Sequence, residues 1–233
     1  MKPLFFSCIA GLVLASCTIN TADLHKKLKH STIVKSSGKE EIEANSPMET
    51  KTFRVGKINS ITASLAMEYI IQKGDEDRVE ITSNALEYID VSNHGTLSVG
   101  YTHSGKFENV NTKVVVYVQN FESLTVMSAA SILVKDEFYQ KNLKLDLNSA
   151  GIIKGNFYAE HLDIDASSAS LLEATIKSKK VNIDASSTSK IKLSGSTEKV
   201  KAEATTLAKI NLEHLEYNNI DAKSSTFGKV LTP

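Results

Sequence analysis

The chain has 233 residues, of which 41% are hydrophobic and 23% charged, and its 27 Lys and Arg residues balance 27 Asp and Glu residues. This neutrality argues against nucleic acid or an anionic surface as a partner, because both attract an excess of positive charge. The two cysteines, Cys8 and Cys17, lie near the N-terminus, so the rest of the chain has no thiol for a disulfide, a nucleophile or a metal site.

Residues 1–16 have the pattern of a bacterial lipoprotein signal peptide. Lys2 gives a positive start, and the apolar stretch Leu4–Ala15 is too short to span a bilayer as a mature helix. It leads into Leu14-Ala15-Ser16-Cys17, which looks like a lipobox, so cleavage before Cys17 would leave that thiol to be acylated. The alternative is an ordinary secretory signal with a chance cysteine. The lipobox predicts a membrane partner through the lipid and a place in the cell envelope, at the outer membrane, facing either the periplasm or the exterior.

The rest of the chain divides into a tether and one domain. Residues 17–50 are rich in Lys, Ser, Glu and Asn and have little apolar periodicity, which is typical of a flexible lipid-anchored tether. Residues 51–233 suffice for a single domain with its own core. We expect residues 51–122 to form an irregular β cap and residues 123–233 to form regular repeats.

The irregular part has the alternation of strands. We expect one long strand over Ile61–Ile71, a turn at Gly74–Asp77 and a return strand over Arg78–Thr82. A second hairpin is expected from Tyr88–Val91 to Leu97–Tyr101. These strands would cover the first coil of the repeats, which otherwise exposes apolar residues and unpaired backbone.

The second half repeats a pattern about every nineteen residues. Its reference column comprises Ser149, Ser168, Ser187 and Thr206, with looser copies at Ser128 and Thr226. Apolar or small columns stand two, four and six positions upstream and four positions downstream. A small-residue column two positions downstream comprises Ala130, Gly151, Ser170, Ser189, Ala208 and Gly228. Such self-similarity is typical of a solenoid, in which each repeat buries its apolar face against its neighbours.

The alternation inside each repeat identifies the solenoid. Apolar residues alternate with polar ones in Val181-Asn182-Ile183-Asp184-Ala185, which is the period of a strand with one buried face. No repeat has the spacing of a helix. The sequence therefore predicts an all-β fold, a parallel β-helix with coils of about nineteen residues. Because small residues gather at the corner, we expect the Ser and Thr of the reference column to point inward and to hydrogen-bond along the stack.

Several segments resemble a known bacterial family. These segments are Tyr69–Gly74, Val79–Ile81, Gly95–Val99, and the small-residue runs 128–132, 167–171 and 186–191. They look like the family described as "putative auto-transporter adhesin, head GIN domain", whose recurring motif is Ser-Gly-Ala-Ser; here Ala, Ser or Thr replaces Gly in several copies. The resemblance covers about residues 53–230. It implies a right-handed parallel β-helix in a lipoprotein or secreted setting, and it carries no catalytic residues.

Four carboxylates form an outward column three positions upstream of the reference column. They are Asp146, Asp165, Asp184 and Glu203, at steps of nineteen residues. In register they would lie about 4.8 Å apart, and a bound Ca²⁺ would relieve their repulsion. The alternative is a solvated acidic ridge neutralised by Lys144 and Lys201. The second interpretation is favoured because no loop with the further ligands of a calcium site repeats, and no cofactor is expected.

A catalytic site is not expected. Enzymes on β-helices use Asp or Glu with Arg or Lys in a groove, but Arg54 and Arg78 are the only arginines and both precede the repeats. The six His show no ligand spacing, and the Ser residues do not lie beside a His and an acid. Trp is absent, which leaves tyrosines as sugar-stacking platforms. The candidates are Tyr101, Tyr139, Tyr158 and Tyr217.

The sequence thus predicts a non-enzymatic, lipid-anchored envelope protein that binds surfaces, in adhesion or in envelope assembly, through a glycan or protein ligand. The alternative is a carbohydrate-active or glycan-binding β-helix that uses the outward acidic face. The final coil would leave Ile220, Ala222 and Val230 with one stacking neighbour. We expect either a weak homodimer through this C-terminal coil or an end blunted by Leu231–Pro233.

Overall fold

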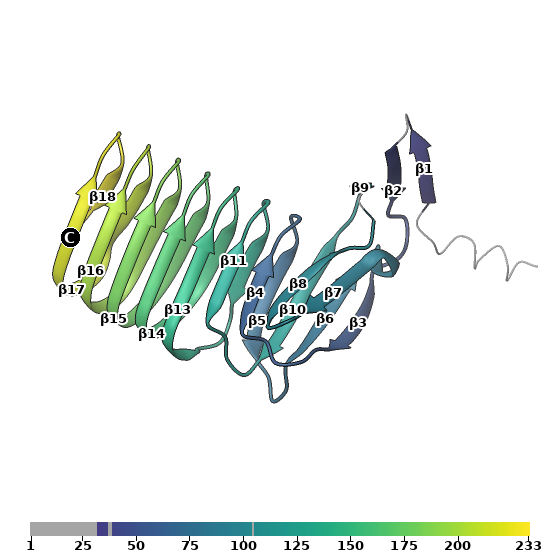
Figure 1. Ribbon diagram of the computed structural model, residues 1–233, viewed down its shortest axis with the longest axis horizontal. Coiled ribbons are helices and arrows are strands. Elements are labelled where there is room, and N and C mark those ends of the chain that lie inside the picture. The colour runs from purple at the N-terminus through teal and green to yellow at the C-terminus, as the bar shows by residue number, and fades with distance from the viewer. Residues whose placement is uncertain (1–31, 37–38, 104) are drawn as a thin grey trace, which may run out of the picture.

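The computed structural model describes residues 32–36, 39–103 and 105–233, and the predicted signal peptide and Cys17 lie outside these residues. Within the described part, coils of β-strand stack side by side along one axis, with an irregular group of strands at their N-terminal end (Figure 1). None of the helical structure described there is long and apolar enough to cross a membrane.

The repeats form the coils. Their strands are β11 (Ser123–Val126), β12 (Ser131–Val134), β13 (Tyr139–Leu147), β14 (Ile152–Ala166), β15 (Leu171–Ala185), β16 (Lys190–Ala204), β17 (Lys209–Ser224) and β18 (Lys229–Leu231). Neighbouring coils pair in parallel, and Ile164, Ile183 and Ala202 share one row. The nineteen-residue step therefore sets the register, and the predicted parallel β-helix is confirmed.

Each coil is flattened and has two edges. At one edge a tight turn separates consecutive strands; at the other, a strand such as β14 bends without interruption (Figure 1). We call these the turn edge and the bend edge. The outer side of the strands that lead into each turn carries the acidic column, and we call it the acidic face. Strand residues that follow the turn form the second face, which continues into the bend edge.

The interior is filled by the apolar columns. In one coil, Val181, Ile183 and Ala185 are each at most 4% exposed, while Asp184 between them faces outward. The small-residue column also points inward, with Ser170 and Ser189 buried at the turn edge. Ser189 donates through its Oγ to the carbonyl of Ala166 at 3.1 Å, so this hydroxyl is buried with a partner.

The prediction that the reference column points inward, by contrast, is wrong. Ser149, Ser168, Ser187 and Thr206 are exposed at the turn edge. Ser187 and Thr188 both have positive φ, 51° and 64°, and the amide of Ser189 donates to the carbonyl of Ser186 at 3.1 Å. Two consecutive left-handed residues make a tight turn of the type I′ kind, which directs their side chains outward. The turns are linked by backbone bonds, such as Thr188 N to Thr206 O at 3.1 Å, rather than by hydroxyls.

The left-handed turn predicts how glycine substitutions change the free energy of unfolding. A non-glycine residue in the left-handed region carries a conformational cost that glycine avoids, partly offset by glycine's larger unfolded-state entropy. Ser187→Gly should therefore raise the free energy of unfolding by about 0.5 kcal/mol, read from the urea midpoint. Ser186→Gly, one residue earlier where φ is not positive, is the matched control and should lower it by about 0.5–1 kcal/mol. Equal losses in both variants would contradict the left-handed turn.

The first coil begins earlier than expected. The segment predicted as one strand over Ile61–Ile71 is two strands, β4 (Ser60–Ala63) and β5 (Glu68–Lys73), which pair in parallel with β11 and β12. Between them Leu65 and Ala66 have φ of 61° and 55°, so the same turn is present. The repeat was hidden because the turn residues are Leu and Ala and because further strands are inserted before β11.

The inserted strands cap this coil. They are β6 (Arg78–Ser83), β7 (Ile89–Asn93), β8 (Thr96–Tyr101), β9 (Lys106–Glu108) and β10 (Thr112–Val118), with a 3-10 helix at Leu86–Tyr88. The hairpin of β7 and β8 is confirmed. The hairpin of β5 and β6 is wrong, since β10 lies between them, parallel to β5 and antiparallel to β6. β3 (Glu49–Arg54) pairs with the other side of β6.

Strands also occur where a tether was predicted. β1 (Thr32–Ser36) and β2 (Lys39–Glu43) form an antiparallel hairpin, and β2 pairs with β9. Ile42 is buried and opposite Phe107, which explains how a mostly polar segment docks on the cap. Strands thus occupy part of residues 32–50, and residues 17–31 lie outside the described residues; the tether stays a prediction.

The C-terminal coil is less covered than the others. Ile220 and Val230 are half-buried and Ala222 is exposed, whereas the equivalent residues of the preceding coil are buried. Leu231 does not fold back over this coil; it continues β18 and pairs with Asn211. Self-association through this coil stays a prediction.

Candidate functional site

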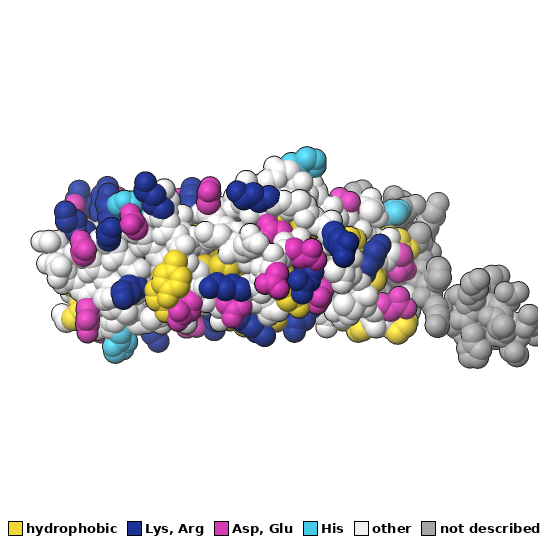
Figure 2. Space-filling view, turned by 90° about the horizontal axis from the view of Figure 1, so that it is seen from below, with side chains coloured by type: hydrophobic (Ala, Val, Ile, Leu, Met, Phe, Trp, Pro, Cys, Tyr) yellow, Lys and Arg dark blue, Asp and Glu magenta, His cyan; other side chains and the backbone are white. Residues whose placement is uncertain are grey.

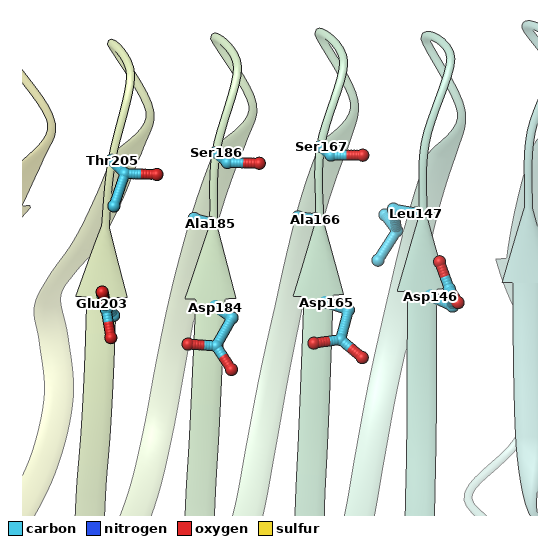
Figure 3. Close-up of a pocket in the computed structure, with 10 residues that line it drawn as sticks. All are labelled: Asp146, Leu147, Asp165, Ala166, Ser167, Asp184, Ala185, Ser186, Glu203 and Thr205. Carbon is cyan, nitrogen blue, oxygen red and sulfur yellow. The ribbon is translucent and has the colours of Figure 1, made fainter. Parts of the chain in front are cut away.

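The four predicted carboxylates lie in one line on the acidic face. Asp146, Asp165, Asp184 and Glu203 are register partners on successive coils, and Figure 3 shows them side by side. In-register strands are about 4.8 Å apart, so each carboxylate has a like charge as its nearest row neighbour. The row ends at Lys223, the register partner of Glu203.

A row of hydroxyls runs beside the carboxylates, closer to the turn edge. Ser167, Ser186 and Thr205 form this row, and together with the carboxylates they line a shallow groove of about 330 Å³ (Figure 3). None of the residues that line this groove is aromatic or Arg. The acidic face is therefore a regular array of oxygen atoms without a stacking surface for a sugar.

Partners on the same face partly neutralise the array. Lys144 Nζ lies 3.0 Å from Asp165 Oδ2, and this hydrogen bond raises the pKa of Lys144. Asn182 Nδ2 donates to Asp163 Oδ1 at 2.6 Å. Lys201 forms no ion pair with any residue that the structure describes. Because Lys144 and Asp165 are about half exposed, their pair contributes at most about 1 kcal/mol.

The geometry of the column does not resemble a metal site. In the described part of the chain, no group of three or more His, Cys, Asp or Glu side chains could hold a metal ion. The four carboxylates form an open line, in which Asp165 has one carboxylate on each side, rather than a cage around one point. Cation binding by this column stays a prediction from the sequence.

The other predicted residues are dispersed. Arg78 stacks over the ring of Tyr117 at 3.7 Å, on the N-terminal cap. Tyr101 stacks on Phe107 with centroids 4.2 Å apart, and Tyr217 is packed against the core. These side chains serve packing and do not form a shared groove. The structure does bring together the two remaining tyrosines.

Tyr139 and Tyr158 form a pair on the outside of the solenoid, where the second face meets the bend edge. They are register partners on β13 and β14, with ring centroids 5.0 Å apart and planes inclined at 30°. Tyr139 is 67% exposed. Tyr158 is half-buried. The exposure of Tyr139 is unusual, because an aromatic side chain gains free energy on burial.

The pair forms one wall of a groove of about 790 Å³, which we call the tyrosine groove. Gln140, Ala159 and Ser178 lie on its floor, since they follow the wall residues by one position in each strand. The opposite side comprises Lys141, Glu160, Lys179 and Glu198. Figure 2, which views the solenoid from the bend edge, shows single hydrophobic side chains scattered among charged ones along this side.

One carboxylate holds both rings. Tyr139 Oη donates to Glu137 Oε2 at 3.0 Å, and Tyr158 Oη donates to Glu137 Oε1 at 3.1 Å. A phenol that donates to a carboxylate loses its proton less readily, so Glu137 raises the pKa of both tyrosines. The rings are therefore fixed by a shared acceptor, although Tyr139 is exposed and Tyr158 is half-buried.

Sequence reasoning named the two tyrosines as possible platforms but missed the other groove residues. Tyr139, Tyr158 and Lys177 stand nineteen residues apart, and the repeat could have placed them in one row. Glu137 gave no such signal, because it precedes β13 and lies outside the regular columns.

The shared acceptor predicts a pH response. Glu137→Gln removes the negative acceptor, so Tyr139 and Tyr158 should ionise at lower pH than in the wild type, closer to free tyrosine. Difference titration of tyrosinate absorbance measures this shift. Glu160→Gln is the matched control, because Glu160 bonds Lys179 instead and should leave the titration unchanged. Identical curves for wild type and Glu137→Gln would contradict the shared hydrogen bonds.

A family model matches most of the solenoid and cap. The family described as "Putative auto-transporter adhesin, head GIN domain" matches residues 57–175 and 169–232. The chain belongs to this family. The prediction from the quoted motifs is therefore confirmed, and the family indicates a cell-surface or envelope protein. No curated protein matches the chain.

Solved structures share the fold. A putative adhesin from Parabacteroides merdae has a TM-score of 0.73 at 16% identity, over 82% of each chain. A putative adhesin from Parabacteroides distasonis has a TM-score of 0.67 at 12% identity, over 83% of this chain and 97% of that one. A putative lipid binding protein from the same species has a TM-score of 0.59 at 12% identity, over 83% and 99%. At these identities the likeness supports the β-solenoid fold alone.

Proposed function

We propose that the chain is a non-enzymatic, surface-binding protein of the bacterial envelope, anchored by lipid on Cys17. The adhesin family match, which extends over residues 57–232 in two overlapping segments, is the observation that carries this proposal. The outer surface is consistent with it, because long rows of exposed side chains repeat along a stiff solenoid and both grooves are open to solvent. Such a surface suits binding to an extended partner better than enclosing a reacting molecule.

The residues of the described part also lack a catalytic arrangement. Arg54 and Arg78 lie on the N-terminal cap, away from both grooves. The carboxylates of the acidic face lie beside Ser, Thr, Lys and Asn side chains. They are not arranged as a general acid and a general base in two different environments. We therefore assign adhesion or envelope assembly rather than sugar cleavage.

The lipid anchor gives a direct prediction. Cells fed labelled palmitate should incorporate label into the wild-type chain, and Cys17→Ser should abolish incorporation and release the chain from the membrane pellet, because the acylated thiol is gone. Cys8→Ser is the matched control: this cysteine lies inside the predicted signal and its loss should leave labelling intact. Labelling that survives in Cys17→Ser would refute the anchor.

The binding role requires access to the outside or to the envelope interior. Protease treatment of intact cells should remove the solenoid if it acts in adhesion. If it acts in envelope assembly, protease should reach the solenoid only after the periplasmic contents are released. A chain recovered only from the cytoplasm would exclude both roles.

A further inference from the structure

The tyrosine groove has features that a purely structural surface does not need. Tyr139 and Tyr158 contact each other and Glu137, yet Tyr139 stays 67% exposed. Apart from these contacts, no hydrogen bond joins either ring to the rest of the described chain. An exposed pair with fixed ring positions gives a ligand an apolar contact at low entropic cost.

Three Lys and two Glu line the groove, and only one Lys and one Glu among them form an ion pair. Glu160 is bonded to Lys179 at 3.1 Å, and Glu137 accepts from the two phenols. Lys177 is the register partner of Tyr158, and Lys141 lines the same groove. Neither forms an ion pair with a residue that the structure describes. Beside the rings, the groove thus presents two ammonium groups that donate to a ligand carboxylate, with Glu198 as the other charged group that has no ion pair in the described part of the chain.

The floor of the groove is closed by the strands themselves. Gln140 is only 8% exposed and donates through Nε2 to the carbonyl of Phe121 at 2.9 Å. Its side chain is on the inner side of β13, because it alternates with the outward Tyr139 and Lys141. The side chains available to a ligand are therefore the two rings and the polar residues beside them.

From these features we infer that the tyrosine groove binds an acidic oligosaccharide. The C–H face of a pyranose ring packs against the tyrosine pair, its carboxylate lies between Lys141 and Lys177, and its hydroxyls contact Ser178. An extended chain runs along the solenoid axis, where coils repeat at about 4.8 Å, similar to the rise of one ring in a 1→4-linked chain. This inference rests on the surface-binding role proposed above and gives it a ligand class.

The site differs from the one that the sequence favoured. The acidic face would repel a uronate, whereas the groove on the bend edge has the aromatic surface and the free lysines. The flat apolar surface of the pair beside the lysines fits the C–H face and carboxylate of a uronate, and competition by an acidic peptide tests the alternative.

The test is calorimetric titration of the full-length chain in detergent micelles with a galacturonate hexasaccharide. Wild type should bind, and Tyr158→Ala should weaken binding at least about tenfold, the equivalent of one good ring contact. Lys177→Gln should weaken it at low salt and differ little from wild type at high salt, because the contact is electrostatic. Lys201→Gln, an unpaired lysine on the acidic face, is the matched control and should bind as wild type. Melting curves of the variants verify that each is folded.

Several results would overturn the inference. They are absence of wild-type binding at millimolar hexasaccharide, unchanged binding by Tyr158→Ala, and an equal loss in Lys177→Gln and Lys201→Gln. Equal binding of a neutral hexasaccharide would refute the role of the lysines, and full competition by oligoglutamate would refute the sugar. If the hexasaccharide fails while cells still need the chain to adhere, this inference falls and the surface-binding role stands.

Discussion

Replacing Ile183 by Asp should unfold the middle of the solenoid, with a loss of about 4 kcal/mol or more in the free energy of unfolding. Ile183 is 1% exposed and lies in a row between Ile164 and Ala202. An aspartate there would bury a carboxylate between two coils with no cation or donor beside it. Because each coil is stabilised by its neighbours, the loss should spread to the adjacent repeats. Urea unfolding followed by circular dichroism measures it.

The neighbouring residue is the control. Asp184→Asn changes a side chain that is exposed and has Asp165 and Glu203 as row neighbours. Removing one of three like charges should leave stability within about 0.5 kcal/mol of wild type or raise it slightly. A large loss in Asp184→Asn would mean that the column binds a cation after all.

Gly195→Ala should cost about 3 kcal/mol, since the added methyl group has no space. A Cβ at Gly195 would lie within 2.1 Å of the carbonyl oxygen of Ile176 in the preceding coil, and φ is +101°. The clash is with backbone rather than with a side-chain tip, so relief requires separating two coils. Ile176 and Leu215 are the register partners of Gly195 on the two adjacent coils, so the glycine lies between two large residues.

The matched control for this change is Gly100→Ala. A Cβ at Gly100, in the hairpin of β7 and β8, would have no atom within 4 Å. The substitution should therefore be close to neutral, while Gly195→Ala lowers the urea midpoint strongly. Similar small effects at both positions would show that the coils are packed more loosely than the structure describes.

The solenoid itself could be predicted because the sequence repeats with a fixed period. Apolar residues such as Leu162, Ile164 and Ala166 recur every nineteen residues, and parallel pairing in register is what places them in common rows. The direction of the reference column could not be predicted. Positive φ is usually revealed by glycine, but these two turn positions are Ser187 and Thr188. Their small size suggested an inward position.

The strand pairing of the N-terminal cap could not be predicted, for a different reason. Alternation predicts strands but not their partners, so nothing in the sequence showed that β10 would lie between β5 and β6. The tyrosine groove is an intermediate case. Its row of Tyr139, Tyr158 and Lys177 follows from the period, but the carboxylate of Glu137 that holds the rings comes from a loop with no repeat.

The most direct test of a lipid-anchored surface binder is adherence of a deletion strain to a panel of polysaccharide-coated and protein-coated surfaces. The deletion strain should adhere less than wild type to at least one surface. Expression of the wild-type chain or of Lys201→Gln should restore adherence, and expression of Cys17→Ser should not. A deletion strain that adheres as well as wild type to every surface, or full restoration by Cys17→Ser, would contradict the account.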